Sequence, residues 1–387
     1  MSMIPYGRQD ISEADMQAVL EVLRSDFLTQ GPAVPEFESA VAAFSNVGHA
    51  VAFNSATSAL HAACLALGLG KGDRLWTSPN TFVASSNCGL YCGAEVDFVD
   101  IDPVTWNIST AKLEERLADA KRTGALPKVL VPVHFAGQPT EQEKIHSLAQ
   151  EYGFKVLEDA SHSVGGSRNG EPVGSCRWSD ITIFSFHPVK IVTTGEGGMA
   201  LTNDPELAEH MRLLRTHGIT RDAALMESPD PAPWQYEQQT LGFNYRMTDI
   251  QAALGRSQLA RLSGFVEARN SLARQYQELL SELPLQLPQV LPCNYSAYHL
   301  YVVRLRPAKI ARTHRGVFEE LRRRGIGVNL HYTPVYLQPY YKRLGFEPGL
   351  CPEAEMYATE ALTLPLYPAL TPEQQQYVVQ TLKEVLR

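Results

Sequence analysis

A lysine that could act as a nucleophile follows an apolar run near the middle of the chain. The run Ile181–Phe186 is followed by Lys190 and then by glycines 195, 197 and 198. Most lysines are solvated surface cations, but burial depresses the pKa of a lysine and makes it a competent amine nucleophile. Glycines let the backbone turn tightly and approach a ligand closely. We therefore interpret Lys190 as a candidate catalytic residue.

A carboxylate stands at the end of the preceding apolar run. Residues Phe154–Glu158 form a strand-like segment, and Asp159 follows directly. Aspartate is a favoured helix N-cap, so a cap is one interpretation of Asp159, and a carboxylate that faces a bound cofactor is the other. Because ligands of parallel sheets bind beyond the carboxyl ends of the strands, we expect Asp159 and Lys190 at the same edge.

A possible anion site begins after the strand-like run Ala50–Phe53. The segment Ser55–Ser58 comes next, and apolar residues then recur at helical spacing. Free N–H groups and the helix dipole make such a helix start attractive to anions, and Thr57 and Ser58 add hydroxyl donors. An ordinary serine or threonine cap is the alternative interpretation.

These three features together match the needs of pyridoxal phosphate, which are an amine, a carboxylate and an anion cradle. Lys190 would bond to the aldehyde, Asp159 would keep the pyridine nitrogen protonated, and Ser55–Ser58 would hold the phosphate. Lys190, once released by the substrate, would move a proton between the substrate carbon and the cofactor carbon. The residues therefore predict a pyridoxal-phosphate-dependent aminotransferase.

The elements that must position these residues alternate along the first two-thirds of the chain. Strands are expected at residues 50–53, 73–77, 95–100, 128–133, 154–158, 181–185 and 198–201. Helical patterns occupy residues 55–68, 80–92, 110–120 and 140–152. Such alternation implies crossover units and predicts an α/β fold with a mainly parallel sheet covered by helices.

The pattern changes in the last third of the chain. A long loop is expected at 217–240, a long helix at 247–282, a strand at 301–305, a helix at 314–324 and a strand at 326–331. We therefore predict a large cofactor-binding domain, with an N-terminal substrate-binding arm, over residues 1–260. A small α+β domain is predicted over residues 261–387.

Composition places the chain among soluble globular proteins. It has 387 residues, 44% hydrophobic and 20% charged, with a formal net charge of −8. This mildly acidic balance argues against nucleic acid or an anionic membrane as the main partner. Six scattered cysteines do not complete a zinc pattern and favour a reducing compartment. Without a zinc pattern, we expect no metal. The sequence shows neither a signal peptide nor a long apolar run, and we therefore predict a cytoplasmic protein.

The order Asp159, then Ser185-Phe186-His187-x-x-Lys190, then Thr193-Thr194-x-Glu196-Gly197-Gly198 resembles the DegT/DnrJ/EryC1/StrS family of sugar-nucleotide aminotransferases. Further matches lie at residues 28–32, 81–84, 132–138, 241–249 and 330–334, so the resemblance covers almost the whole chain. It implies the type I fold of aspartate aminotransferase, with a seven-stranded sheet, and a homodimer with shared active sites.

The resemblance also assigns roles in cofactor binding. Phe82 would stack on the pyridine ring, and His162, which is glutamine in many relatives, would lie by the ring hydroxyl. Ser185 would bind the phosphate beside Ala56 and Thr57, and Asn244 would reach it from the neighbouring subunit. The alternatives are a core aromatic residue for Phe82 and a plain loop residue for Asn244.

Within the family, the N-terminal segment and the Asn54–Leu60 stretch resemble the branch of pseudaminic acid biosynthesis. That branch uses L-glutamate to aminate C4 of a UDP-linked 4-keto-6-deoxy-N-acetylhexosamine, giving UDP-4-amino-4,6-dideoxy-N-acetyl-β-L-altrosamine. The resemblance implies substrate contacts from Tyr6, Thr29, Gln30, Gly31, Pro32, Ala56, Ser185, Lys190, Asn244, Asn329, Leu330, His331 and Tyr332. Many relatives have Gly-Thr where Ala56-Thr57 stands, so the cradle departs from their pattern.

Other functions are compatible with parts of this pattern. The substrate could be another keto-sugar nucleotide, such as a 4-keto arabinose or a 3-keto hexose. A dehydratase branch carries histidine in place of the lysine, and Lys190 argues against it. A non-catalytic cofactor-binding regulator is disfavoured because Asp159 and Lys190 are both present. Arg246 and His331 are candidates for holding the glutamate carboxylates.

Overall fold

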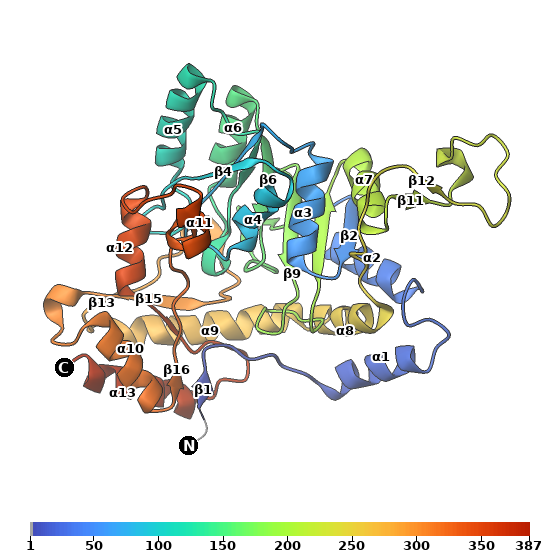
Figure 1. The fold of residues 1–387 in the computed structure, drawn as a ribbon. Coiled ribbons are helices and arrows are strands. Elements are labelled where there is room, and N and C mark those ends of the chain that lie inside the picture. Colours follow the sequence, from blue (N-terminus) through green and yellow to red (C-terminus); the bar gives the residue numbers. More distant parts are fainter. Residues whose placement is uncertain (1–2) are drawn as a thin grey trace.

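The computed structural model describes residues 3–387, which are built around one seven-stranded sheet (Figure 1). Its strand order is β2-β10-β9-β6-β5-β3-β4. The strands are β2 His49–Phe53, β3 Arg74–Thr77, β4 Glu95–Phe98, β5 Val129–Val131, β6 Lys155–Asp159, β9 Ile181–Ser185 and β10 Gly198–Thr202. β10 is antiparallel to both neighbours, and the other pairs are parallel. The seven predicted strands are confirmed, with small shifts at their ends.

Helices cover both faces of this sheet, which explains why successive strand residues are apolar. In β2, Val51 and Phe53 belong to one core cluster, whereas Ala50 and Ala52 belong to another. The first face carries α3 Ala56–Ala66, α4 Ala84–Tyr91 and α7 Pro205–Arg215. The other carries α2 Ala33–Ser45, α5 Thr110–Thr123, α6 Gln142–Tyr152, α8 Asp249–Leu259 and α9 Leu262–Leu280. The predicted α/β layering is therefore confirmed, although α2 and α7 were not expected.

Two predicted elements in the last third are wrong. The long helix expected at 247–282 is divided into α8 and α9, because Arg261 leaves the helical conformation and its guanidinium binds the carboxylates of Asp10 and Asp15. The strand expected at 326–331 is confined to β16, Ile326–Gly327, which pairs with β1, Ile4–Pro5. Past β16 the chain is irregular, with one isolated bridge from Asn329 to Thr363, and residues 329–333 line a cavity.

A second core lies around a three-stranded antiparallel sheet. Its strands are β13 Leu285–Gln286, β15 Tyr301–Leu305 and β17 Ala361–Leu364. Side chains of α9, α10 His314–Arg323 and α13 Pro372–Val385 complete this core. The short helices α11 Pro339–Arg343 and α12 Pro352–Glu360 pack instead on the first core. The separate second core supports the proposal of a small α+β domain, and its start at residue 261 remains our proposal.

Two segments extend from this framework (Figure 1). Helix α1, Glu13–Leu23, which was not predicted, packs on α8. The loop predicted at 217–240 projects from the sheet, and only the two-residue strands β11 Ile219–Thr220 and β12 Glu237–Gln238 pair within it. Within residues 3–387, no helix is both long enough and apolar enough to span a membrane.

Candidate active site

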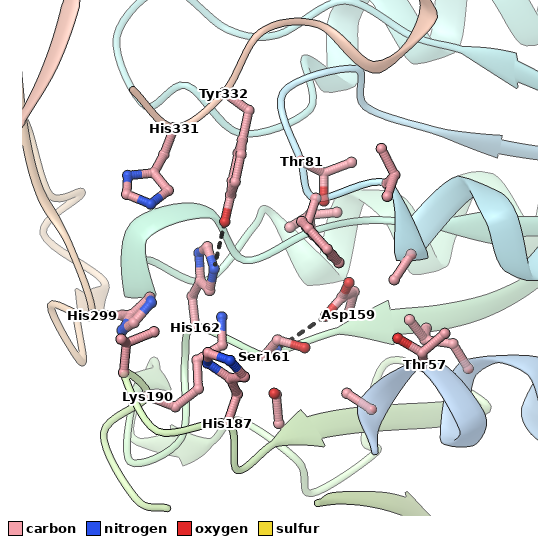
Figure 2. Close-up of a pocket in the computed structure, with 18 of the residues that line it drawn as sticks. Thr57, Thr81, Asp159, Ser161, His162, His187, Lys190, His299, His331 and Tyr332 are labelled. Atoms are coloured by element: carbon pink, nitrogen blue, oxygen red, sulfur yellow. Dashed lines mark hydrogen bonds between the residues drawn. The ribbon is translucent and has the colours of Figure 1, made fainter. Parts of the chain in front are cut away.

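A cavity of about 700 Å³ lies at the carboxyl ends of β6 and β9 (Figure 2). This volume is within the usual range for small-molecule sites. The predicted site residues that line it are Tyr6, Ala56, Thr57, Phe82, Asp159, His162, Ser185, Lys190, Asn329, Leu330, His331 and Tyr332. The fold therefore brings together residues that lie far apart in the sequence.

Five predicted residues do not line this cavity within one chain. Thr29, Gln30 and Pro32 are exposed, and the Asp249 carboxylate at the start of α8 accepts the N–H of Gly31 at 2.9 Å. Pro32 borders a separate hollow beside α1 and α8. Asn244 is also exposed. Their contacts with cofactor or substrate stay predictions that require a second copy of the chain.

Lys190 is held in a tight turn after β9. Its N–H donates to the carbonyl oxygen of His187 at 2.9 Å, and its side chain is half-buried in the cavity wall. Burial lowers the pKa of Lys190 to about 8, against the opposing effect of Asp159. The neutral amine is therefore accessible near neutral pH, as a nucleophile requires.

Asp159 ends β6 and is fixed by two donors. The hydroxyl of Ser85 donates to Oδ2 at 2.6 Å, and the N–H of Ser161 donates to Oδ1 at 3.1 Å. The chain turns after Asp159 and forms no α-helix there, so the cap interpretation does not apply. Ser85 was not predicted, although its place four residues after Thr81 on a helix start was a possible signal.

The anion cradle at the start of α3 is smaller than predicted. Ser55 caps the helix by accepting the N–H of Ser58 at 3.1 Å, and the Ser58 hydroxyl donates to Asn54. Ser58 is absent from the described cavity lining and its hydroxyl proton goes to Asn54, so its role as an anion donor finds no support here and stays a prediction. Ser55, Ala56 and Thr57 line the cavity at the start of α3, where a helix has free N–H groups, and Ser185 lines it as well.

The glycine at the start of β10 is required beside this cradle. A Cβ built on Gly198 would lie 2.5 Å from the nitrogen of Ala56. No side chain fits between β10 and the first turn of α3. This close approach sets the N–H groups of α3 at the cavity wall, where a phosphate can be held.

Phe82 exposes its ring to the cavity. Its side chain is 60% accessible although it follows the buried residue Thr81. The alternative of a core aromatic is therefore wrong. An apolar ring that is exposed inside a cavity suits stacking on a flat ligand ring.

His162 lies on the cavity wall, and its two ring nitrogens have different partners. Nδ1 accepts the N–H of Ala136 at 3.3 Å, which leaves the proton on Nε2, 3.3 Å from the hydroxyl of Tyr332. Burial, followed by the charges of Lys190 and His331, holds the pKa of His162 well below its usual range. His162 is therefore a neutral donor at pH 7.

The N-terminal arm and the segment after β16 form the mouth of the cavity. The pairing of β1 with β16 places Tyr6 beside Asn329 and His331, and the rings of Tyr6 and His331 are 5.1 Å apart between centroids. His331 Nδ1 lies 2.8 Å from the Thr363 hydroxyl, and burial lowers its pKa to about 3. The mouth therefore offers neutral hydrogen-bonding groups.

Several lining residues were not predicted. They include Thr81, Ser161, His187, Glu196, His299 and Gln338. His299 precedes β15 in an apolar stretch, where a lone histidine gives no signal of function. Its position at the cavity depends on how the second core packs against the first.

The residues of the cavity fit pyridoxal phosphate. Lys190 supplies an amine, Asp159 a fixed carboxylate, the start of α3 an anion cradle, and Phe82 an exposed ring. Among residues 3–387, no group of three histidine, cysteine or acidic side chains could hold a metal ion. The chemistry that this set can support is reaction of an amine with a carbonyl group and proton transfer at the adjacent carbon.

Comparisons with known proteins agree with this geometry. The family model of the DegT/DnrJ/EryC1/StrS aminotransferase family matches residues 9–383. The spore coat polysaccharide biosynthesis protein SpsC of Bacillus subtilis is 38% identical, over 99% of this chain and 97% of its own. A UDP-4-amino-4,6-dideoxy-N-acetyl-beta-L-altrosamine transaminase of Campylobacter jejuni is 37% identical, over 99% and 98%. The structure of Helicobacter pylori PseC, an aminotransferase of pseudaminic acid biosynthesis, superposes with a TM-score of 0.91 at 31% identity, over 100% and 99%.

Proposed function

Because this chain belongs to the DegT/DnrJ/EryC1/StrS aminotransferase family, we propose that it aminates C4 of a UDP-linked 4-keto-6-deoxy-N-acetylhexosamine with L-glutamate. The product would be UDP-4-amino-4,6-dideoxy-N-acetyl-β-L-altrosamine. The chain is a pyridoxal-phosphate-dependent sugar aminotransferase of the type I fold. The observation that supports the aminotransferase chemistry of this proposal is that Lys190 and Asp159 line one cavity with the start of α3.

Different residues of the cavity would bind the cofactor and transfer the proton. Pyridoxal phosphate, when bound, supplies an electron sink for the carbon that loses its proton. Asp159, fixed by Ser85, would hold a proton on the ring nitrogen of the cofactor, while Ala56, Thr57 and Ser185 would hold its phosphate. The Nζ atom of Lys190 would take the proton from the substrate carbon and pass it to the cofactor carbon on the other side of the reacting nitrogen.

The choice of sugar rests on relatives and on the mouth of the cavity. The Campylobacter relative is named as a transaminase for this product, and the Helicobacter structure as an aminotransferase of pseudaminic acid biosynthesis. Tyr6, Asn329 and His331 at the mouth offer hydrogen bonds to sugar hydroxyls. We propose that Thr29–Pro32 and Asn244 reach this site from the second subunit of a homodimer.

A different keto-sugar nucleotide is the second candidate. The relative named for spore coat polysaccharide biosynthesis is as similar to this chain as the altrosamine transaminase is. A non-catalytic regulator is set aside, since Lys190 and Asp159 both line the cavity.

An amination assay tests the proposal. The protein would be incubated with L-glutamate and a panel of UDP- and dTDP-linked keto-sugars, and mass spectrometry would detect the amino sugars. We expect the UDP-linked 4-keto-6-deoxy-N-acetylhexosamine to react fastest. Faster amination of a 4-keto arabinose or a 3-keto hexose would transfer the assignment to the second candidate.

A further inference from the structure

His299 lines the cavity, and neither the cofactor nor the sugar gives it a role so far. It lies just before β15, and its side chain is 5% exposed. Its Nδ1 atom is buried without a hydrogen-bond partner among residues 3–387. A buried nitrogen without a partner destabilises a fold, because it has lost its hydrogen bonds to water. Nε2 has no hydrogen-bond partner within residues 3–387 either, and it is not among the fully buried atoms, so it is the ring nitrogen that a ligand in the cavity can contact.

The backbone of His299 is fixed by contacts from both cores. Arg269, which is fully buried, donates to the carbonyl oxygens of His299 at 3.2 Å and of Leu366 at 3.0 Å. Gly137 has a φ of +106°, and a Cβ built on it would lie 2.9 Å from the nitrogen of His299. These contacts fix the backbone of His299, so the fold holds its imidazole at the cavity wall.

His299 lies beside the reacting amine. In the view of Figure 2, the labelled side chains of His299, His162 and Asp159 are arranged around that of Lys190. The rings of His162 and His299 are 4.4 Å apart between centroids. Burial first, and the charge of Lys190 next, hold the pKa of His299 well below its usual range. Its imidazole is therefore neutral at pH 7 and can donate one N–H.

An amino-acid donor brings a carboxylate next to this position. Its α-carboxylate is bonded to the carbon that reacts, so it must lie close to Lys190. Lys190 itself is engaged in covalent and proton-transfer chemistry. Among the residues from 3 to 387 that line the cavity, there is no arginine to pair with the carboxylate. Neutral donors in the wall must therefore bind it, or an arginine of a second subunit must reach it.

A neutral donor suits a site that receives two substrates in turn. The sugar nucleotide presents uncharged hydroxyls near the reacting carbon, and an arginine there would then be left buried without a partner. A neutral imidazole donates to a carboxylate in one half-reaction and to a hydroxyl in the other. It therefore serves both substrates without an unpaired charge.

We propose that the imidazole of His299 donates a hydrogen bond to the α-carboxylate of the amino-acid donor. This inference rests on the proposed function only in requiring an amino-acid donor, and it is independent of which sugar is aminated. It assigns His299 to the carboxylate contact, for which Arg246 and His331 were the candidates from the sequence. Arg246, like Asn244 two residues before it, does not line the cavity of one chain, and it would reach the site only from a second subunit.

The test compares three replacements that separate shape from hydrogen bonding. His299→Phe keeps a ring but cannot donate, whereas His299→Asn and His299→Gln place an amide N–H near the positions of Nδ1 and Nε2. The first half-reaction would be followed by cofactor absorbance with L-glutamate and with 4-aminobutyrate, an amine that lacks the α-carboxylate. His210→Phe, on α7 outside the cavity, is the matched control.

We expect His299→Phe to lower kcat/KM for L-glutamate by roughly 10- to 100-fold, the effect of one hydrogen bond to a charged group. The rate with 4-aminobutyrate should stay within about threefold, and Asn or Gln should recover much of the loss with glutamate. Equal losses with both amines, or no recovery by either amide, would overturn the proposal.

A measurement without turnover provides a second readout. L-2-methylglutamate keeps the α-carboxylate but has no proton on the reacting carbon, and its binding shifts the cofactor absorbance. His299→Phe should raise its Kd roughly 10-fold or more, and an unchanged Kd would contradict the contact. If the unchanged protein converts L-glutamate but aminates no sugar on the panel, the proposed sugar substrate is wrong and the inference about His299 is still tested.

Discussion

The reactivity of Lys190 depends on how deeply the fold buries its amine. A solvated lysine is charged until pH 10 or above, and so it can neither attack an aldehyde nor accept a proton near neutral pH. At the cavity wall, burial brings the pKa of Lys190 down to about 8. About a tenth of the molecules would then carry a neutral amine at pH 7.

This pKa predicts how the apoprotein takes up pyridoxal phosphate. The rate of covalent attachment should rise with pH up to about 8 and then level off, because the neutral amine is the reactive form. An ordinary lysine would give a rate that keeps rising to about pH 10.4. Stopped-flow absorbance would give the profile, and borohydride trapping should label the peptide that contains Lys190.

Two results would contradict this assignment, namely labelling of another lysine or a midpoint near that of an exposed lysine.

The same pKa affects stability, because between pH 8 and about 10.4 the unfolded chain holds a proton that the folded chain does not. The free energy of unfolding of the apoprotein should therefore rise with pH in this window.

Ser85 is the residue that fixes the carboxylate of Asp159. Ser85→Ala removes the 2.6 Å hydrogen bond to Oδ2. A hydrogen bond to a charged group contributes about 1.5–3 kcal/mol, so the affinity for pyridoxal phosphate should fall roughly 10- to 100-fold. Fluorescence titration of the apoprotein would measure the loss. Ser147→Ala, on the exposed side of α6, is the control, and equal affinities of the two variants would refute the role of Ser85.

At the scale of elements, the anion cradle depends on the contact between α3 and β10. β10 lies between β2 and β9, so it passes directly beneath the first turn of α3. The absence of a side chain on Gly198 allows this close contact. The position of the phosphate site is thus set by two elements that are more than a hundred residues apart.

Gly198→Ala should therefore damage cofactor binding more than the fold. The added Cβ would lie 2.5 Å from the nitrogen of Ala56 and must push the start of α3 away. We expect a loss of about 1–3 kcal/mol in the free energy of unfolding and a loss of more than roughly 10-fold in cofactor affinity. Urea unfolding and cofactor titration would measure the two effects.

Gly264 offers a matched control for this substitution. It lies in α9, and a Cβ built there meets no atom within 4 Å. Gly264→Ala should stabilise the protein by up to about 1 kcal/mol and leave cofactor affinity unchanged, because alanine favours a helix. If Gly198→Ala also binds the cofactor normally, the close contact is not required.

At the scale of the whole molecule, some predicted site residues, namely Thr29–Pro32 and Asn244, lie outside the cavity of their own chain. Phe27 and Leu28 expose about half of their side chains next to Thr29–Pro32, and Leu241 is 78% exposed close to Asn244. Exposed apolar residues beside predicted site residues are typical of a surface that another chain covers. This arrangement supports the proposal of a homodimer that shares its active sites.

A mixing experiment tests the shared site. If Asn244 acts in the cavity of its partner, a heterodimer of Asn244→Ala and Lys190→Ala subunits contains one complete site. Random mixing makes about half of the dimers heterodimers, so about a quarter of the normal activity should return. Activity no greater than the sum of the two separate variants, with heterodimers shown by native mass spectrometry, would place Asn244 outside the partner's site.

Much of the fold was predictable because the signals for the central sheet are local. Its strands are buried on both faces and therefore appear as short apolar runs, each followed by a turn or a helix. Lys190 and Asp159 were found because they directly follow such runs. The break between α8 and α9 was missed because it depends on Arg261 and carboxylates at the other end of the chain.

The sequence by itself determined the sheet, the lysine, the carboxylate and the start of α3, since each depends on neighbours within a few residues. Only the tertiary structure decided that Ser85 binds Asp159, that Gly198 passes under Ala56, and that His299 reaches the cavity. The physical reason is that these contacts join segments from different elements, and their geometry is set by the packing of two cores. No local pattern encodes that packing.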